Sequence, residues 1–363
     1  MYSLAAGTHT ADEMLNMLTT DRSIWYEYDL LDKDDTPLGK ITAQGSIDYD
    51  STVGIQRCAS LTIKEEKDID FLSERVRPSM CLRTNTGIVH YPLGVFLMSS
   101  PSRKAGVGHV GRSIECYDKC QILADDKFDS RYRVTAGTNY IGAASAIIAS
   151  AGISDALLTV SNKTLAADLE FAMGTSKLEA VNALLKACNY NNLYADASGR
   201  LIGKPYEDPV TRTIDTTYAT NSKSIVFSGA EEELDVFNAP NKIVRYLETA
   251  DRDVLIATVT NTDPLSKLST VSRGRTIVDI KAVSDIADQA TLEAFTQREA
   301  AEAKIYQKII FETAAMPNHE NLDCLYVINK DLDVQGKYIE LAWHLEMTVG
   351  GRMSHTCRRA VSI

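Results

Sequence analysis

The sequence lacks any apolar run that approaches the roughly 20 residues of a membrane-spanning helix. Residues 1–22 contain no basic segment followed by an apolar one, so we expect neither a signal peptide nor membrane insertion. Basic residues are also in short supply, since 38 Lys and Arg stand against 49 Asp and Glu and give a net charge of −11. Because Lys and Arg must neutralise phosphates, this balance disfavours non-specific binding of nucleic acid.

Signatures of the common enzyme classes are missing as well. The chain contains no G-x4-G-K-[ST] phosphate loop, no G-x-S-x-G nucleophile turn and no H-E-x-x-H metal motif. Its six histidines, none of which forms a pair at helical spacing, are His9, His90, His109, His319, His344 and His355. His344 and His355 lie in strand-like runs, where we expect partly buried structural histidines. We therefore predict no catalytic residue.

Potential metal ligands favour a structural interpretation. The seven cysteines are odd in number and scattered, which is typical of reduced thiols rather than of a disulfide framework. Cys116 and Cys120 form a C-x3-C pair, but no second Cys or His pair at ligand spacing accompanies them. The acidic run at residues 231–235 is interpreted as a solvated strand or loop, with a cation site or a negative surface as the alternative. We predict no metal and no cofactor.

Gly106, Gly108 and Gly111 have the G-x-G-x-x-G spacing of dinucleotide-binding loops. That fingerprint requires a strand, a tight glycine turn and a helix whose N-terminus holds the pyrophosphate. Here the glycines precede "RSIECYD", in which Ile114 and Cys116 alternate with polar residues at period two. A strand rather than a helix is therefore predicted after Gly111. We interpret the motif as a glycine-rich hairpin loop, which disfavours nucleotide binding.

Patterns of period two dominate residues 1–132. A short helix comes first, with Thr10 as its N-cap and with Asp12 and Glu13 near its positive end. Strand-like runs then follow closely, among them "SIWYEYDLLD", "CASLTIKEE" and "YPLGVFLMSSPS". This rhythm is typical of an antiparallel barrel or sandwich rather than of alternating strands and helices.

Residues 133–215 have a different character and predict a small inserted α+β domain. "TNYIGAASAIIASAG" indicates a helix that ends at Gly152. Ser176 and Glu179 have the spacing of a capping box at the start of a second helix. "NLYADASGRLIGKPY" then contains two β-type runs around a turn, which indicates a hairpin.

Residues 216–363 return to strand-like runs, interrupted by one long helix pattern near residues 289–304. The predicted class is therefore α+β, mostly β. Two tube-like antiparallel β-barrel domains, at residues 1–132 and 216–363, flank the insertion at residues 133–215.

Three segments give the chain a resemblance to a known family. Residues 91–128 hold "YPLGVFLMSSPSR" and, after the glycines, "SIECYDKCQILADDKF"; residues 176–206 hold a helix, a hairpin and "KPY"; residues 297–327 hold a helix, a strand and "PNHENLDCLYV". In this order the segments resemble the central baseplate or tail-tip hub proteins of tailed phages and related contractile injection systems. They are packing patterns rather than catalytic signatures.

The resemblance implies a virion structural protein without enzymatic activity. Hub proteins of this kind form homotrimers in which two related β-barrels per chain give a pseudo-six-fold ring, a symmetry adaptor between the tail tube and a three-fold spike or fibre. Expected partners are further copies of the chain, the tail tube protein, a spike or tail-fibre protein, other baseplate proteins and the tape-measure protein. DNA would pass only transiently through the lumen, which an acidic wall suits. The expected location is the virion tail, assembled in the bacterial host cytoplasm.

Alternatives remain open at this point. They are a tail-associated cell-wall hydrolase, a nucleotide-binding cytosolic enzyme suggested by the glycine motif, and a monomeric carbohydrate-binding β protein. Many larger tail-tip hubs continue into a receptor-binding or peptidoglycan-degrading region, whereas this sequence ends at Ile363. We therefore expect any wall-degrading activity to reside in another protein.

The glycine-rich loop is the candidate for a contact with a neighbouring subunit or the tube, because small residues provide clearance. Replacing Gly108 with a bulky residue is expected to impair assembly more than folding of the single chain. Comparing thermal unfolding with ring formation by electron microscopy tests this. Equal loss of both would contradict it.

Overall fold

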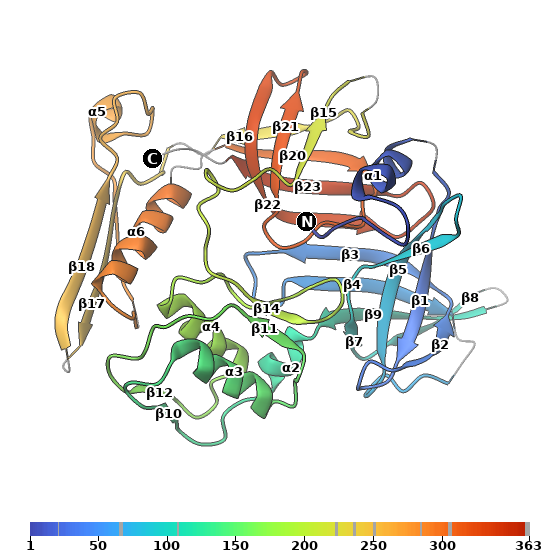
Figure 1. The fold of residues 1–363 in the computed structure, drawn as a ribbon, viewed down its shortest axis with the longest axis horizontal. Helices are drawn as coiled ribbons and strands as arrows, with labels where there is room; N and C mark the ends of the chain where they lie inside the picture. The colour runs from blue at the N-terminus through green and yellow to red at the C-terminus, as the bar shows by residue number, and fades with distance from the viewer. Residues whose placement is uncertain are drawn as a thin grey trace.

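The computed structural model describes residues 1–20, 22–64, 68–106, 109–221, 224–234, 237–249, 252–283, 285–303 and 307–359. Strands dominate it and a few helices lie at the periphery (Figure 1). The predicted α+β, mostly β class is confirmed. None of the helices in the described part of the chain is both long enough and apolar enough to span a membrane.

Fifteen of the described strands form one large sheet. From the first part of the chain it takes β1 (Ile24–Leu31), β2 (Pro37–Ile41), β3 (Ala43–Asp50), β4 (Arg57–Lys64), β5 (Arg75–Arg83), β6 (Ile88–Pro92), β7 (Phe96–Met98), β8 (Ser102–Gly106) and β9 (His109–Asp118). From the last part it takes β15 (Thr216–Ala219), β16 (Glu231–Leu234), β20 (Gln307–Ala314), β21 (Cys324–Asn329), β22 (Val334–Glu346) and β23 (Arg352–Arg359).

The order of the main path is β16-β20-β23-β22-β3-β4-β9-β7-β5-β1-β2. The two β-rich segments that the sequence separates are therefore halves of one sheet, joined where β3 pairs with β22. Within the described strands the path is open, because β16 and β2 are its two ends and do not pair with each other. The sequence does not predict this join, since it depends on pairing between distant segments.

Alternation of side chains explains why these segments are strands. In β4, Ala59, Leu61 and Ile63 point into the core, while the residues between them are half-buried or exposed. β20 shows the same period over its whole length. Each of these strands therefore contributes one apolar face to the core.

Helix α1 (Ala11–Thr19) packs against the hydrophobic core of the large sheet, which we call the first core. Thr10 and Glu13 form a reciprocal capping box at its start, which satisfies two backbone N–H groups. Met14 and Leu18 are fully buried in the same cluster as residues of the last part of the chain, among them Trp343 and Leu345. The two halves of the sheet thus share a core as well as backbone hydrogen bonds.

The predicted insertion has its own core. Its elements are β10 (Tyr132–Val134), α3 (Tyr140–Ser150), β11 (Ala156–Leu158), β12 (Leu169–Phe171), α4 (Lys177–Ala187), β13 (Tyr194–Ala195) and β14 (Leu201–Gly203). Helix α2 (Cys120–Asp125), which precedes the predicted boundary at residue 133, packs into the same core. The Ser176 hydroxyl caps α4 by accepting from the backbone N–H of Glu179. β13 and β14 form the predicted hairpin.

A third unit, which the sequence analysis does not separate, lies at one end of the molecule (Figure 1). It consists of β17 (Lys242–Thr249), β18 (Arg252–Thr260), α5 (Thr270–Arg273), β19 (Val278–Ala282) and α6 (Gln289–Ala303). β17 is the central strand of this separate sheet, and α6 covers one face through Leu292 and Phe295. α6 confirms the helix predicted near residues 289–304.

Gly45 in β3 provides a test of how tightly the sheet is packed. A Cβ atom on Gly45 would lie 1.9 Å from the backbone oxygen of Ser60 in β4, so the strands would have to separate. Gly45→Ala is expected to lower the free energy of unfolding by about 3 kcal/mol or more. Urea unfolding of the purified chain measures the loss.

Gly111 in β9 is the matched control, because its added Cβ would meet the Thr62 methyl group at an ordinary 3.5 Å. Gly111→Ala is expected to change the free energy of unfolding by less than about 1 kcal/mol. Similar effects of the two substitutions would show that β3 and β4 do not approach as described.

Candidate functional site

The join between β3 and β22 is the candidate functional site, because it holds the two halves of the chain in one sheet. Tyr49 pairs with Trp343 and Asp48 with His344 across it. The rings of Tyr49 and Trp343 stack with their centroids 5.5 Å apart. On the outer face, Asp48 Oδ1 lies 2.7 Å from His344 Nδ1. His344 is thus a partly exposed strand residue with a carboxylate partner.

A buried arginine, Arg57, contacts the join and two other parts of the molecule. Arg57, in β4, is only 2% exposed and its guanidinium lies over the Trp343 ring, 5.3 Å from the centroid. It donates to the backbone oxygen of Leu93 at 2.7 Å and to Glu320 at 3.2 Å. Glu320 also accepts from the backbone N–H of Ala197 in the insertion. One ion pair therefore connects both halves of the sheet with the inserted domain.

Behind the join, Glu340 of β22 is completely buried between two histidines. Its two carboxylate oxygens lie 2.5 Å from His319 Nδ1 and 2.5 Å from His355 Nδ1. On the far side of each ring, Nε2 lies 2.8 Å from a hydroxyl, that of Tyr218 for His319 and that of Thr313 for His355. Each ring nitrogen thus has a polar partner.

The charge of this network follows from its burial. Burial alone would raise the pKa of Glu340, but the two histidines, His319 foremost, lower it to about 2. Burial lowers the pKa of His355, although Glu340 opposes the shift. Because its pKa is about 2, Glu340 is a carboxylate at neutral pH, held by hydrogen bonds inside the core. The nearby carboxylate of Asp323 accepts from the Met1 ammonium group, yet burial keeps the pKa of Asp323 raised.

The network of His319, Glu340 and His355 has a structural role. His319, Glu340 and His355 place three potential ligand atoms within 4.8 Å, but all three residues are at most 1% exposed and already satisfy one another. A substrate has no access to such a group. His355, for which partial burial was predicted, is completely buried. His319 and Glu340 carry no local signal, since only the fold brings them together.

A cavity of about 350 Å³ lies where the β3–β4 loop, the insertion, α6 and β22 meet. Two of its cations already have partners: Arg298 bonds Glu302 and lies over the Tyr206 ring, and Arg212 donates to the backbone oxygen of Leu322. Among the described residues that line it there is no cysteine and no histidine, and its Ser51 and Thr52 hydroxyls therefore have no imidazole base beside them. This described lining does not offer the nucleophile–base pair of nucleophilic catalysis.

Two of the three glycines of the predicted loop lie in β8 and β9, which are neighbouring antiparallel strands. Gly106 ends β8 and pairs with His109, and Gly111 lies in β9. The run after Gly111 is a strand, as predicted, so the helix required for a dinucleotide site does not follow it. Gly108 lies outside the described residues. A subunit contact at this loop stays a prediction.

The other predicted groups are placed as follows. Cys116 and Cys120 are buried thiols, and among the described residues they belong to no group of three potential metal ligands. Residues 231–234 of the acidic run form the exposed edge strand β16, which fits the interpretation as a solvated strand, and Asp235 lies outside the described residues. A second group of potential ligands, Glu27, Cys81 and His90, was not predicted because its members come from three separate strands.

No family profile and no curated protein matches the chain. Solved structures do. A tail protein from Neisseria meningitidis MC58 superposes with a TM-score of 0.67 and 14% identity, over 92% of this chain and 97% of its own. The 43 kDa tail protein of prophage MuSo2 from Shewanella oneidensis gives 0.62 and 12%, over 92% and 98%. Prophage tail protein gp18 from Listeria monocytogenes EGD-e gives 0.58 and 12%, over 93% and 95%. The chain therefore has the fold of these tail proteins, and the resemblance inferred from the sequence is confirmed at that level.

Replacing Glu340 tests the buried network. Glu340→Gln presents an amide N–H2 group to a ring N–H that needs an acceptor, so we expect a loss of about 3–5 kcal/mol in unfolding free energy at pH 7. Because the folded pKa of Glu340 lies below its usual value, its stabilisation is complete above about pH 4.5 and declines toward pH 2. The difference between wild type and variant is therefore expected to shrink across that range.

Asp48→Asn is the control, since its carboxylate also faces a histidine but at the surface. It is expected to cost less than about 1 kcal/mol. Equal effects at Asp48 and Glu340, or a Glu340→Gln difference that grows on acidification, would contradict the role assigned to the network.

Proposed function

We propose that this chain is a structural hub of a phage or phage-like tail, a homotrimeric ring that joins the tail tube to a spike or fibres. The observation that carries the proposal is the likeness to tail proteins along more than nine-tenths of the chain. The proposed location is the virion tail, and the proposed role is non-enzymatic. The proposed partners are other copies of this chain, the tube protein, a spike or fibre protein and further baseplate proteins.

The layout of the chain supports a ring with two repeats per subunit. Strands from residues 24–118 and 216–359 form the two halves of the large sheet, while residues 120–201 supply nearly all of a separate core. We accordingly divide the chain into tube-like units at residues 1–132 and 216–363 and an insertion at 133–215. Three such chains would present six β-rich halves to a hexameric tube.

An uncovered apolar face supports contact between copies. On the side of the β17–β19 sheet opposite α6, Ile256 of β18 is 56% exposed and Ile280 of β19 is 61% exposed. Tyr246 and Val244 of β17 lie between them in register. This face points away from the rest of the molecule, at one end of its long axis (Figure 1). Apolar surface of this kind on three adjacent strands marks an interaction site.

The occupant we assign to this face is a second copy of the chain. Copies with a net charge of −11 repel one another, so they must meet through surface that carries little charge. A stable interface buries roughly 800 Å² per partner, so this face would be one part of the ring contact. A position at the end of the long axis suits a contact with the next subunit.

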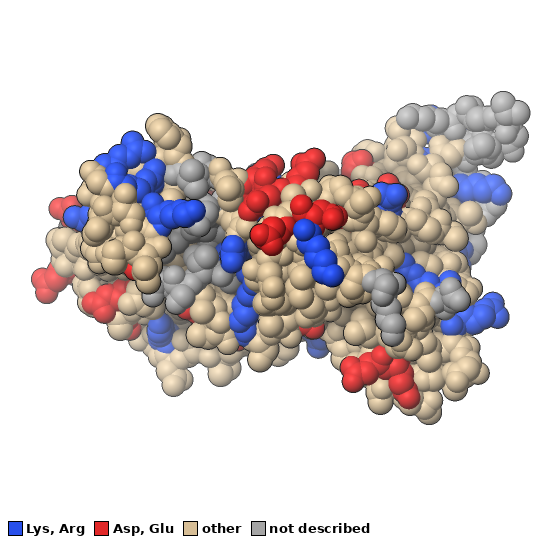
Figure 2. Space-filling view, turned by 90° about the horizontal axis from the view of Figure 1, so that it is seen from above, with Lys and Arg blue, Asp and Glu red and all other residues tan. Residues whose placement is uncertain are grey.

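The acidic balance is compatible with DNA that passes through the ring without binding. Figure 2 shows acidic side chains gathered near the middle of one long face, with basic side chains between and beside them rather than in one continuous patch. Such a surface offers no extended track of cations for phosphates on that face.

Disrupting the apolar face tests the assembly. The wild-type chain is expected to sediment as a trimer, alone or on addition of tail tubes, and to form three-fold rings by electron microscopy. The double variant Ile256→Glu/Ile280→Glu is expected to remain a single chain with nearly unchanged thermal unfolding, since both side chains already lie in solvent.

Val160→Glu is the matched control, because Val160 is 87% exposed on the insertion. It is expected to keep the ring. A wild-type chain that stays single even on tail tubes would overturn the proposed function. A double variant that still forms rings would overturn the assignment of this face.

A further inference from the structure

Three neighbouring strands bring a carboxylate, a thiol and an imidazole together on one side of the large sheet. Cys81 of β5 is the direct cross-strand partner of His90 in β6. Glu27 of β1 lies diagonally across from Cys81, because Cys81 pairs with Trp25 two residues earlier. All three side chains therefore point to the same side of the sheet.

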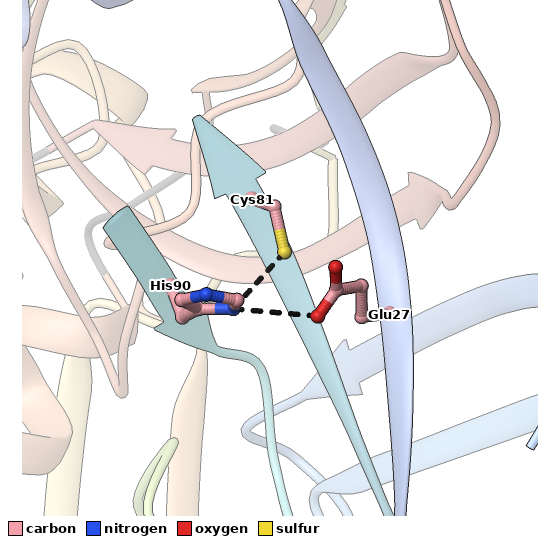
Figure 3. Close-up of side chains that lie close together, drawn as sticks. All are labelled: Glu27, Cys81 and His90. Atoms are coloured by element: carbon pink, nitrogen blue, oxygen red, sulfur yellow. Dashed lines mark hydrogen bonds and ion pairs between the residues drawn. The ribbon is translucent and has the colours of Figure 1, made fainter. Parts of the chain in front are cut away.

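The three groups converge on one point (Figure 3). His90 Nδ1 lies 3.2 Å from Cys81 Sγ and 3.6 Å from Glu27 Oε2. All three potential ligand atoms lie within 4.8 Å of one another. The His90 side chain is 47% exposed and Cys81 is buried, so solvent reaches the group from the side of His90.

This geometry does not suit a cysteine nucleophile. A catalytic thiol and its orienting carboxylate contact opposite nitrogens of the histidine, as the nucleophile–base–orienter arrangement requires. Here the thiol and the carboxylate face the same nitrogen, Nδ1. Atoms that converge on one point are arranged like ligands around an ion.

We propose that Glu27, Cys81 and His90 bind a divalent transition-metal ion of the Zn²⁺ type. Sulfur, imidazole nitrogen and carboxylate oxygen are the donors that Zn²⁺ takes in proteins, and three of them leave a fourth, tetrahedral position for water. Binding replaces the Cys81 S–H bond with an S–Zn bond and releases one proton to solvent.

Neighbouring side chains prepare Glu27 for this role. The indole N–H of Trp25 donates to Glu27 Oε1 at 3.0 Å, which leaves Oε2 directed at the cluster. A hydrogen bond of this kind to a ligating carboxylate orients it and tunes its affinity. The Lys40 ammonium group now bonds Glu27 Oε2 and supplies the positive charge there. Lys40 lies on the edge strand β2 and is 59% exposed, so it can yield to an ion by moving into solvent.

The experiment titrates the full, reduced chain with Co²⁺, a spectroscopic substitute for Zn²⁺. We expect a near-ultraviolet band from thiolate-to-cobalt charge transfer that is displaced by Zn²⁺. Cys81→Ser is expected to abolish the band and His90→Ala to weaken binding strongly. Trp25→Phe, which removes the hydrogen bond to Glu27 but keeps an aromatic ring beneath Arg83, is expected to weaken binding about tenfold.

Two further variants separate this site from adventitious binding. Cys58→Ser removes the half-exposed thiol of β4 and is expected to leave the band intact. Lys40→Met removes the competing ammonium group and is expected to tighten binding. The absence of a thiolate band, its persistence in Cys81→Ser, its loss in Cys58→Ser, or weaker binding by Lys40→Met would each overturn the proposal.

Discussion

The pairing of β3 with β22 joins segments 296 residues apart, measured from Asp48 to His344, and the rest of the architecture depends on it. Loop-closure entropy grows only slowly with length, so a contact this distant costs little more than a nearer one. In return it places Trp343 and Leu345 in the first core and aligns Arg57 with Glu320. The first and last parts of the chain thereby form one continuous sheet.

Ring packing at the join and buried charges beside it specify the alignment of β22. Because side chains alternate along a strand, a slip of one residue against β3 would turn Trp343 away from Tyr49. A slip of β22 against β23, its other neighbour, would move Glu340 away from His319 and His355. A buried carboxylate without those partners would be costly, so competing registers are strongly disfavoured. In the ring that we propose, every copy must have the same shape, and a fixed register provides this better than additional apolar packing would.

Local signals predicted the elements that local chemistry determines. The caps at Thr10 and Ser176, and the helix α6, follow from residues a few positions apart. The alternation after Gly111 correctly predicted a strand where the glycine spacing alone would suggest a nucleotide site. By contrast, the ligand group of Glu27, Cys81 and His90 arises from the register of three strands. The single large sheet likewise arises from the pairing of β3 with β22. No spacing in the sequence encodes the ligand group or the pairing.

In the proposed assembly each chain contributes two β-rich halves to a ring of three. A three-dimensional reconstruction of the chain on the end of a tail tube, by electron cryo-microscopy, is the decisive experiment. We expect three copies around the axis, with the halves formed by residues 1–132 and 216–363 alternating in six equivalent positions against the tube. A ring of six copies, or three copies in which only one half of each chain contacts the tube, would contradict it.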